Sequence, residues 1–161
     1  MNQGSQADNA PIDSLESLQT ALHQLIPISA HMGITAKSYD GNKLVLTAPL
    51  AANINHQQSA FGGSLFSVSA LAGWSILQLK LAELGMKANT VIAGGDVGYA
   101  LPVFEDIRCE ICLPDNDSGF ATKLQESGRA SLLLTSEIFL QSKPDSAMTF
   151  NGKYVVHKIP S

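Results

Sequence analysis

The sequence predicts an α+β fold in which an antiparallel sheet wraps around one long central helix. Residues 62–84 carry a helical pattern that is apolar on nearly every side, which is typical of a helix buried on nearly every side. Strand patterns elsewhere follow one another without alternating helices, and such runs favour an antiparallel sheet. Since a curved sheet is the simplest cover for an apolar helix, residues 11–161 are expected to form a single domain.

The N-terminal part is predicted as a tail followed by one helix. Residues 1–10 are polar, with neither the basic start nor the apolar run of a signal peptide, so we expect a disordered tail. Residues 13–26 repeat leucine at helical spacing, and Asp13 with Glu16 resembles a capping box. Pro27 is expected to end this helix.

A hairpin and a loop are predicted next. Residues 31–38 and 43–48 are strand patterns, and the sequence Asp-Gly-Asn at positions 40–42 is a strong turn signal between them. A loop is expected over residues 49–60.

The central helix is predicted over residues 62–84, with Gly85 as its C-terminal cap. The segment 60–79 is long enough to span a membrane, but it contains several serines and lacks a basic flank on its N-terminal side. A buried core helix is therefore the preferred interpretation, and we expect a cytoplasmic protein with no membrane partner.

The C-terminal half is predicted to be mostly strands. A turn-rich connection over residues 114–127, with a short helix near 120–125, interrupts them, and Pro144 with Asp145 marks the last turn. The four strand patterns cover residues 90–99, 105–113, 128–140 and 149–158.

Composition excludes several classes of function. The net charge of −4 and the scattered lysines and arginines argue against nucleic acid as a partner. Cys109 and Cys112 form a C-x-x-C, but on a strand their thiols point to opposite faces about 10 Å apart, so neither a disulfide nor a redox role is expected. The histidines lack metal-ligand spacing, so no metal or other cofactor is expected. The low charged fraction of 15% suggests surface buried against another subunit.

The most informative segment is a polar loop that leads into a pair of glycines and the start of the central helix. It covers residues 55–64, with the sequence NHQQSAFGGS. A helix start leaves backbone N–H groups unpaired, and glycines let a substrate carbonyl approach them. Residues 44–79 contain no Asp, Glu, Lys or Arg, so fixed dipoles act in surroundings of low polarity here.

This segment and the order of elements resemble the hotdog fold of thioesterases and dehydratases. In the acyl-CoA thioesterases of that fold, an Asn lies six residues before a His-Gly-Gly that opens the central helix. Here Asn55 lies six residues before Phe61, and Phe61-Gly62-Gly63 stands where His-Gly-Gly would be. The chain is most similar to the bacterial putative thioesterase domain often found C-terminal to an acetyltransferase domain.

The resemblance implies a substrate and an assembly, and this chain differs from the family pattern at one position. It implies an acyl-CoA or acyl carrier protein thioester as the partner, and a site between the subunits of a homodimer or a dimer of dimers. The better known thioesterases carry an Asp or Glu nine residues past the first position of the His-Gly-Gly, where this chain has Ala70. The usual general base or nucleophile is thus missing from its usual place.

Three residues are predicted as catalytic. Asn55 would hold a thioester oxygen or a water, and its alternative is a loop Asn bonded to its own backbone. His56 would act as a general acid or base, or would only order the turn. Gly63 would stabilise an oxyanion through its N–H, or would serve only to let the helix pass under the loop.

Five further residues are predicted to bind substrate. Phe61 and Gly62 begin the motif, and Ser64 and Ser67 would line the site unless they pair only with backbone. Asp96, on the strand after the helix, would supply the missing acid from a partner subunit, or would simply be a solvated or capping residue.

Three functions remain open from the sequence. The leading hypothesis is hydrolysis of acyl-CoA or acyl carrier protein thioesters. The second is decarboxylation of a malonyl thioester feeding fatty acid synthesis, which needs no base to activate water. The third is a non-catalytic acyl-binding domain.

Overall fold

A computed structural model describes residues 10–115 and 118–160 of the chain. Residues 1–9, most of the predicted tail, lie outside the described residues. The elements in chain order are α1 (Leu15–Leu25), α2 (Ile28–His31), β1 (Thr35–Tyr39), β2 (Lys43–Ala48), α3 (Leu50–Asn53), α4 (Gly62–Glu83), β3 (Ala88–Tyr99), β4 (Ile107–Cys112), α5 (Ser118–Ser127), β5 (Arg129–Phe139) and β6 (Ser146–Lys158).

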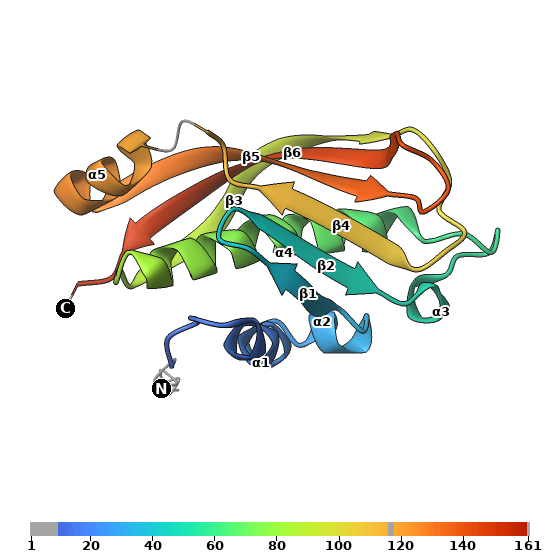
Figure 1. Ribbon diagram of the computed structural model, residues 1–161, viewed down its shortest axis with the longest axis horizontal. Helices are drawn as coiled ribbons and strands as arrows, with labels where there is room; N and C mark the ends of the chain where they lie inside the picture. Colours follow the sequence, from blue (N-terminus) through green and yellow to red (C-terminus); the bar gives the residue numbers. More distant parts are fainter. Residues whose placement is uncertain (1–9, 116–117, 161) are drawn as a thin grey trace, which may run out of the picture.

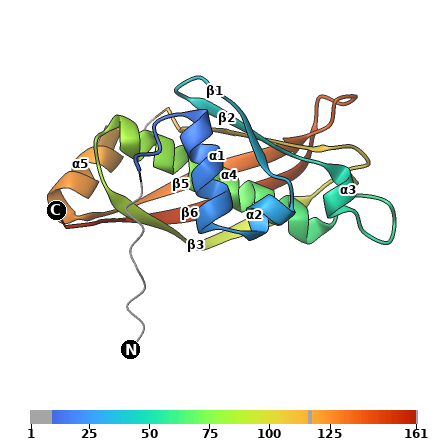
Figure 2. The ribbon, with the colours of Figure 1, turned by 90° about the horizontal axis from the view of Figure 1, so that it is seen from below.

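The strands form one six-stranded sheet in the order β1-β2-β4-β5-β6-β3. Every neighbouring pair is antiparallel. The sheet curves around α4, and α1 packs against α4 and β1 (Figures 1 and 2). The predicted α+β class, with an antiparallel sheet around a long central helix, is confirmed.

The helix α4 is the centre of the hydrophobic core. It is long and apolar enough to cross a membrane by length and composition, but most of that stretch is buried inside the fold. Its residues Val68, Ala72 and Ile76 are fully buried, and it contacts five of the six strands. A helix with this burial is a core helix.

A close approach between α4 and β6 explains one glycine of this helix. The ring of Tyr154 lies against Gly73, where a Cβ atom would overlap it. The Tyr154 hydroxyl donates a hydrogen bond to the carbonyl of Ala70 at 2.9 Å. Tyr154 is itself buried, so this contact fixes the position of β6 against α4.

The two edges of the sheet differ in their cover. At the β1 edge, the side chain of Gln19 on α1 acts like a neighbouring strand, because its Nε2 donates to the carbonyl of Ile34 at 2.8 Å and its Oε1 accepts from the N–H of Ala36 at 2.6 Å. At the other edge, residues 91–100 are all exposed, including Val91, Ile92 and Tyr99. Long apolar edge strands are normally paired or covered, and within the described residues the β3 edge has no such cover.

Several boundaries differ from the sequence prediction. The first helix begins at Leu15, two residues later than predicted, with Ser14 as its N-cap and Ser17, not Glu16, completing the capping box. Residues 28–31 are helical, so β1 begins at Thr35 and not at residue 31. Residues 50–53 also form a short helix inside the predicted loop. In these short segments, contacts with the rest of the fold outweigh local patterns.

The two cysteines lie as the strand pattern predicts. Both are free, with Cys109 buried and Cys112 exposed on opposite faces of β4. Burial raises the pKa of the Cys109 thiol to about 12, which keeps it protonated and unreactive at neutral pH.

One buried hydroxyl offers a direct test of the core. The side-chain oxygen of Ser75 on α4 is buried without a hydrogen-bond partner, which costs stability. We expect Ser75→Ala to raise the free energy of unfolding by about 1 kcal/mol, as measured by urea denaturation. The control is Ser69→Ala, whose hydroxyl donates to Met148 Sδ at 3.4 Å and which should give no such gain. A clear loss of stability in Ser75→Ala would contradict the expectation.

Candidate functional site

The polar loop before α4 is closed on itself. A bridge pairs Ile54 with Ala60, and the N–H of Asn55 donates to the carbonyl of Ser59 at 2.8 Å. The N–H of Ala60 donates to the carbonyl of Val103 at 2.7 Å, which ties the loop to the segment after β3. Gln58 has a positive φ of 64°, as expected of a residue at the tip of a tight turn.

The side chain of Asn55 mainly shapes this loop. Its Oδ1 accepts from the N–H of Gln57 at 2.8 Å and from the N–H of Ser59 at 3.2 Å, while its Nδ2 donates to Ser59 Oγ at 3.1 Å. The turn-forming alternative weighed for this residue is thus part of the structure. One amide hydrogen of Nδ2 remains for a substrate or a water.

His56 lies at the exposed tip of the same loop. Its ring has no hydrogen-bond partner among the described residues. Among the described residues, no group therefore orients His56 as a general base.

The start of α4 presents two unpaired donors. Gly62 and Gly63 are its first two residues, and Phe61 at the N-cap supplies no side-chain hydrogen bond. The next two N–H groups, of Ser64 and Leu65, both donate to the carbonyl of Phe61 at 2.9 and 3.1 Å. The N–H groups of Gly62 and Gly63 therefore remain for an external acceptor, beside the positive end of the helix dipole.

The ring of Phe61 lies over this helix start. A Cβ atom at Gly63 would overlap the ring, so only glycine allows the two to lie so close. Phe61 is 56% exposed, so its ring is held by few contacts. It forms an apolar wall beside the two donors, at the position where the His-Gly-Gly pattern of the resemblance has its histidine.

Tyr99 is a residue of the site that sequence reasoning missed. It is the last residue of β3, and its hydroxyl donates to the carbonyl of Gly62 at 3.0 Å. The hydrogen bond joins the exposed edge strand to the first residue of α4. The sequence placed Tyr99 at a strand end but held no signal that the strand would end beside the glycines.

Asn53 is a second residue that sequence reasoning missed, and its hydrogen bonds fix the site loop to the rest of the fold. Its side chain is only 3% exposed, and Nδ2 donates to the carbonyls of Met32 at 2.9 Å and Pro49 at 2.8 Å. The backbone carbonyl of Asn53 accepts from the N–H of Phe61 at 2.7 Å, and Phe61 directly precedes the two free donors. Asn53 thereby fixes where α4 begins.

The hydroxyls of Ser64 and Ser67 differ in their hydrogen bonding. Ser67 Oγ donates to the carbonyl of Gly63 at 2.8 Å, which is the local backbone pairing that was the alternative to a site role. Ser64 is half-buried, and its hydroxyl has no partner among the described residues.

Within its own chain, Asp96 is not brought to this site, and its role as an acid from a partner subunit stays a prediction. Strand alternation places it on the face of the sheet opposite to α4, where Asn151 Nδ2 donates to its Oδ2 at 3.2 Å. The acids of the neighbouring segment are also engaged, since Asp106 accepts from the N–H of Leu50 and Glu105 from the N–H of Gln141. Within the part of the chain that the structure describes, no free carboxylate lies at the start of α4.

No group of three potential metal ligands gathers anywhere within residues 10–115 and 118–160. The chemistry available at the site is therefore that of donors: two backbone N–H groups, one amide hydrogen of Asn55 and the Ser64 hydroxyl. Such a set suits a substrate oxygen that gains negative charge.

Comparisons with known proteins agree with this arrangement. The model of the family described as "Putative thioesterase (yiiD_Cterm)" matches residues 15–158. A crystal structure of a protein of unknown function from Chlorobaculum tepidum is 33% identical, with a TM-score of 0.86, and the match covers 95% of this chain and 99% of that chain.

Two further structures carry thioesterase descriptions. A putative thioesterase from Shewanella oneidensis is 28% identical over 91% of this chain and 97% of its own, with a TM-score of 0.80. A probable thioesterase from Pseudomonas aeruginosa is 19% identical over the same shares, with a TM-score of 0.78, and supports the fold alone. The hotdog fold expected from the resemblance is confirmed.

Proposed function

Because this chain belongs to the putative thioesterase family whose model covers residues 15–158, we propose that it acts on acyl thioesters of CoA or of acyl carrier protein at the start of α4. One observation carries the proposal, namely the two adjacent N–H groups of Gly62 and Gly63 without an acceptor. A thioester carbonyl placed on them would gain negative charge during attack, and donors there stabilise that charge. Hydrolysis to the free thiol and the acid is the leading reaction.

A second candidate reaction is favoured by what surrounds the donors. Hydrolysis needs a group that takes a proton from water, and no free carboxylate of the described residues lies at the helix start. Decarboxylation of a malonyl thioester breaks a carbon–carbon bond, releases CO₂ and leaves an enolate with a charged oxygen, which then takes a proton from water at carbon to give the acetyl thioester. That oxygen needs donors but no base, so Ala70 in place of an acid is compatible with this reaction.

Product identification separates these reactions. We would incubate the protein with acetyl, malonyl and longer acyl thioesters of CoA and of acyl carrier protein, and identify products by mass spectrometry. Free thiol with the matching acid supports hydrolysis, and an acetyl thioester with CO₂ supports decarboxylation. Saturable binding without any product would overturn both and leave an acyl-binding domain.

We also propose that the active unit is a homodimer joined along β3. Its support is the contrast between the two sheet edges, because Gln19 covers β1 while residues 91–100 stand exposed. Antiparallel pairing of β3 with its copy would join two sheets into one and bury Val91, Ile92 and Val97. A dimer of such dimers remains compatible with this proposal.

The pairing predicts the effect of one charge. Gly94 lies near the middle of β3, and a Cβ atom there meets nothing within 4 Å. Gly94→Lys should therefore leave the protomer folded but place two like charges together across the two-fold axis. We expect a shift from dimer to monomer at micromolar concentration by light scattering, with an unchanged circular dichroism spectrum. Gly119→Lys, at another open and exposed position, is the control, and a dimeric Gly94→Lys variant would contradict pairing along β3.

A further inference from the structure

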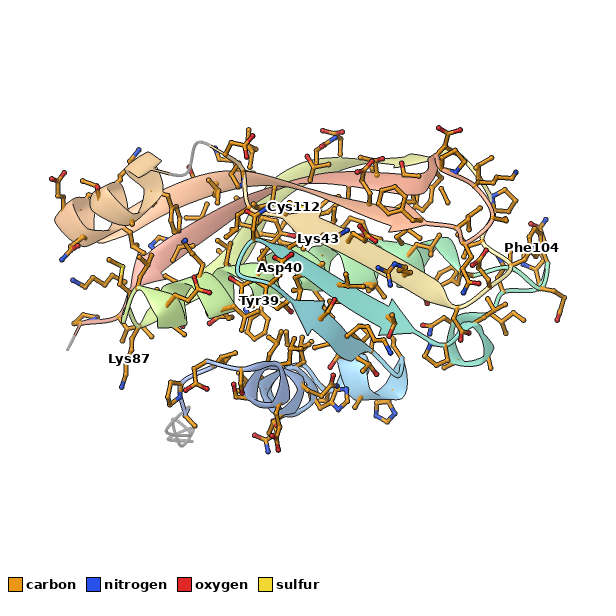
Figure 3. The ribbon with its side chains drawn as sticks, viewed as in Figure 1. Tyr39, Asp40, Lys43, Lys87, Phe104 and Cys112 are labelled. Carbon is orange, nitrogen blue, oxygen red and sulfur yellow. The ribbon has the colours of Figure 1, made fainter. Side chains whose placement is uncertain are left out.

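The hydroxyl of Tyr99 reaches the start of α4 from the exposed edge strand. Tyr99 is the last residue of β3, which runs from the end of the molecule beside Lys87 to the end beside Phe104 (Figure 3). Its register partner on β6, Met148, is fully buried, so both side chains lie on the face of the sheet toward α4. The hydroxyl of Tyr99 donates to the carbonyl of Gly62 at 3.0 Å, which joins the edge strand to the candidate site.

This carbonyl and one of the two unpaired donors belong to the same peptide group. The peptide bond after Gly62 is planar and trans, so it carries the Gly62 oxygen on one side and the N–H of Gly63 on the other. Gly63 is the second residue of α4, and its N–H has no acceptor within the helix. The Tyr99 hydroxyl therefore binds one side of a peptide group whose other side faces the position of a substrate oxygen.

A hydrogen bond on the carbonyl strengthens the donor on the other side of this peptide group. It draws electron density toward the oxygen and leaves the N–H of Gly63 more positive, and hydrogen bonds in such a chain strengthen one another by about 10–30% each. The Gly62 oxygen has two lone pairs, so the helical hydrogen bond leaves one for Tyr99. The same contact restrains the plane of a peptide group in the first turn, where helical hydrogen bonds are fewer.

The other two tyrosines bond to peptide groups whose N–H is already paired. Tyr154 donates to the carbonyl of Ala70 at 2.9 Å, in the interior of α4, where each N–H is paired within the helix. Tyr39 donates to the carbonyl of Gly41 at 3.1 Å, and the N–H that follows is paired with a side chain. Of the three tyrosines, all within the described residues, Tyr99 is the one whose acceptor belongs to a peptide group with an unpaired N–H.

We propose that Tyr99 is a positioning residue that orients and polarises the peptide group between Gly62 and Gly63. The N–H of Gly63 then binds the oxygen of the reacting thioester more strongly. This inference rests on the proposed function and deepens it, because it gives the edge strand β3 control over the strength of a donor. The oxygen carries more negative charge in the transition state than in the bound substrate, so the effect falls mainly on kcat.

Tyr99→Phe tests the role of the hydroxyl, because it keeps the ring. Tyr99 is 53% exposed, so the variant should stay folded with a melting temperature close to that of wild type. One oxyanion donor is worth about 10²- to 10³-fold in kcat, and about 10–30% of this on a logarithmic scale is about 2- to 8-fold. We expect kcat on acyl thioesters to fall by about 2- to 8-fold, with KM changed by less than about twofold. An unchanged kcat would overturn the proposal.

The matched control is Tyr154→Phe, which removes a hydroxyl bonded to another carbonyl of α4. Tyr154 is buried, so the loss of its hydrogen bond should lower the melting temperature. At a temperature where this variant is folded, its kcat should stay within about twofold of wild type, because the peptide group involved presents no free N–H. A fall of kcat equal to that of Tyr99→Phe would assign both effects to a loosened helix and overturn the proposal.

A graded change of the hydroxyl separates polarisation from mechanical support. Fluorotyrosine in place of Tyr99, introduced at a reassigned stop codon, has nearly the same shape but is a stronger donor, because fluorine makes the phenol more acidic. At about pH 6 the phenol stays protonated, and kcat should rise in the order phenylalanine, tyrosine, fluorotyrosine at this position. Equal kcat for tyrosine and fluorotyrosine would overturn the polarising role.

Failure of the proposed function remains distinguishable by a measurement without substrate. The chemical shift of an amide nitrogen responds to a hydrogen bond on the preceding carbonyl, so the shift of Gly63 reports on this peptide group. Tyr99→Phe should move it, whereas Tyr154→Phe should not, and an unmoved Gly63 signal would overturn the proposal whatever the activity. A wild-type protein that turns over no thioester, but whose Gly63 signal moves in Tyr99→Phe, would contradict the enzyme assignment alone.

Discussion

Gly62→Pro is expected to lower kcat by about 10²- to 10³-fold while leaving the protein folded. Gly62 is the first residue of α4, where proline fits the helix and removes only an N–H that has no acceptor within the helix. Phe61 before it has φ −61° and ψ 131°, the extended conformation that a residue preceding proline adopts. The loss corresponds to one removed oxyanion donor, at about 3 kcal/mol of transition-state stabilisation.

The matched control for this variant is Gly62→Ala. A Cβ atom at Gly62 would lie 3.5 Å from the Tyr99 ring, an ordinary contact, and alanine keeps the N–H. Gly62→Ala should therefore retain activity within a few-fold of wild type. Equal activity of the proline and alanine variants, at equal melting temperatures, would contradict a role for the Gly62 N–H.

Gly73→Ala is expected to cause the largest loss of stability from a single methyl group. The added Cβ would overlap the ring and hydroxyl of Tyr154, which is buried and hydrogen-bonded to the carbonyl of Ala70. We expect the free energy of unfolding to fall by about 2 kcal/mol or more, despite the higher helix propensity of alanine. The corresponding decrease in melting temperature is about 4–8 °C, measured at fixed protein concentration because dimerisation affects it.

Two comparisons assign this loss to packing against Tyr154. Gly63→Ala is the same substitution in the same helix, but its Cβ meets only the exposed ring of Phe61, which can move, so little stability should be lost. Combining Gly73→Ala with Tyr154→Leu should restore part of the loss, giving a favourable coupling in a double-mutant cycle. Additive effects of the two substitutions would show that the methyl group acts elsewhere.

Local sequence was sufficient for the long elements. The apolar pattern over residues 62–84 predicted α4 to within one residue at its C-terminal end, because an all-round apolar helix has few alternatives to burial. The strand positions of Cys109 and Cys112 also followed from alternation alone. Short segments were less well predicted, because residues 28–31 and 50–53 take a helical form that depends on contacts from elsewhere.

For the candidate site, the sequence identified the donors but not their neighbours. The paired glycines at a helix start are a local feature, so Gly62 and Gly63 could be found from spacing. Tyr99 and Asn53 could not, because their hydrogen bonds link residues 37 and 21 positions apart. The face of β3 that Asp96 occupies could not be predicted either, because it depends on the register with β6, and its role as an acid from a partner subunit stays a prediction.

The sequence by itself determined the fold class, the central helix and the chemistry of its first turn, because hydrophobic period and turn residues act over a few neighbouring positions. Only the tertiary structure decided which side chains surround that turn and which edge of the sheet is covered. These depend on strand order and register, which join residues far apart in the chain. A single sequence encodes such pairings only through the packing of the whole domain.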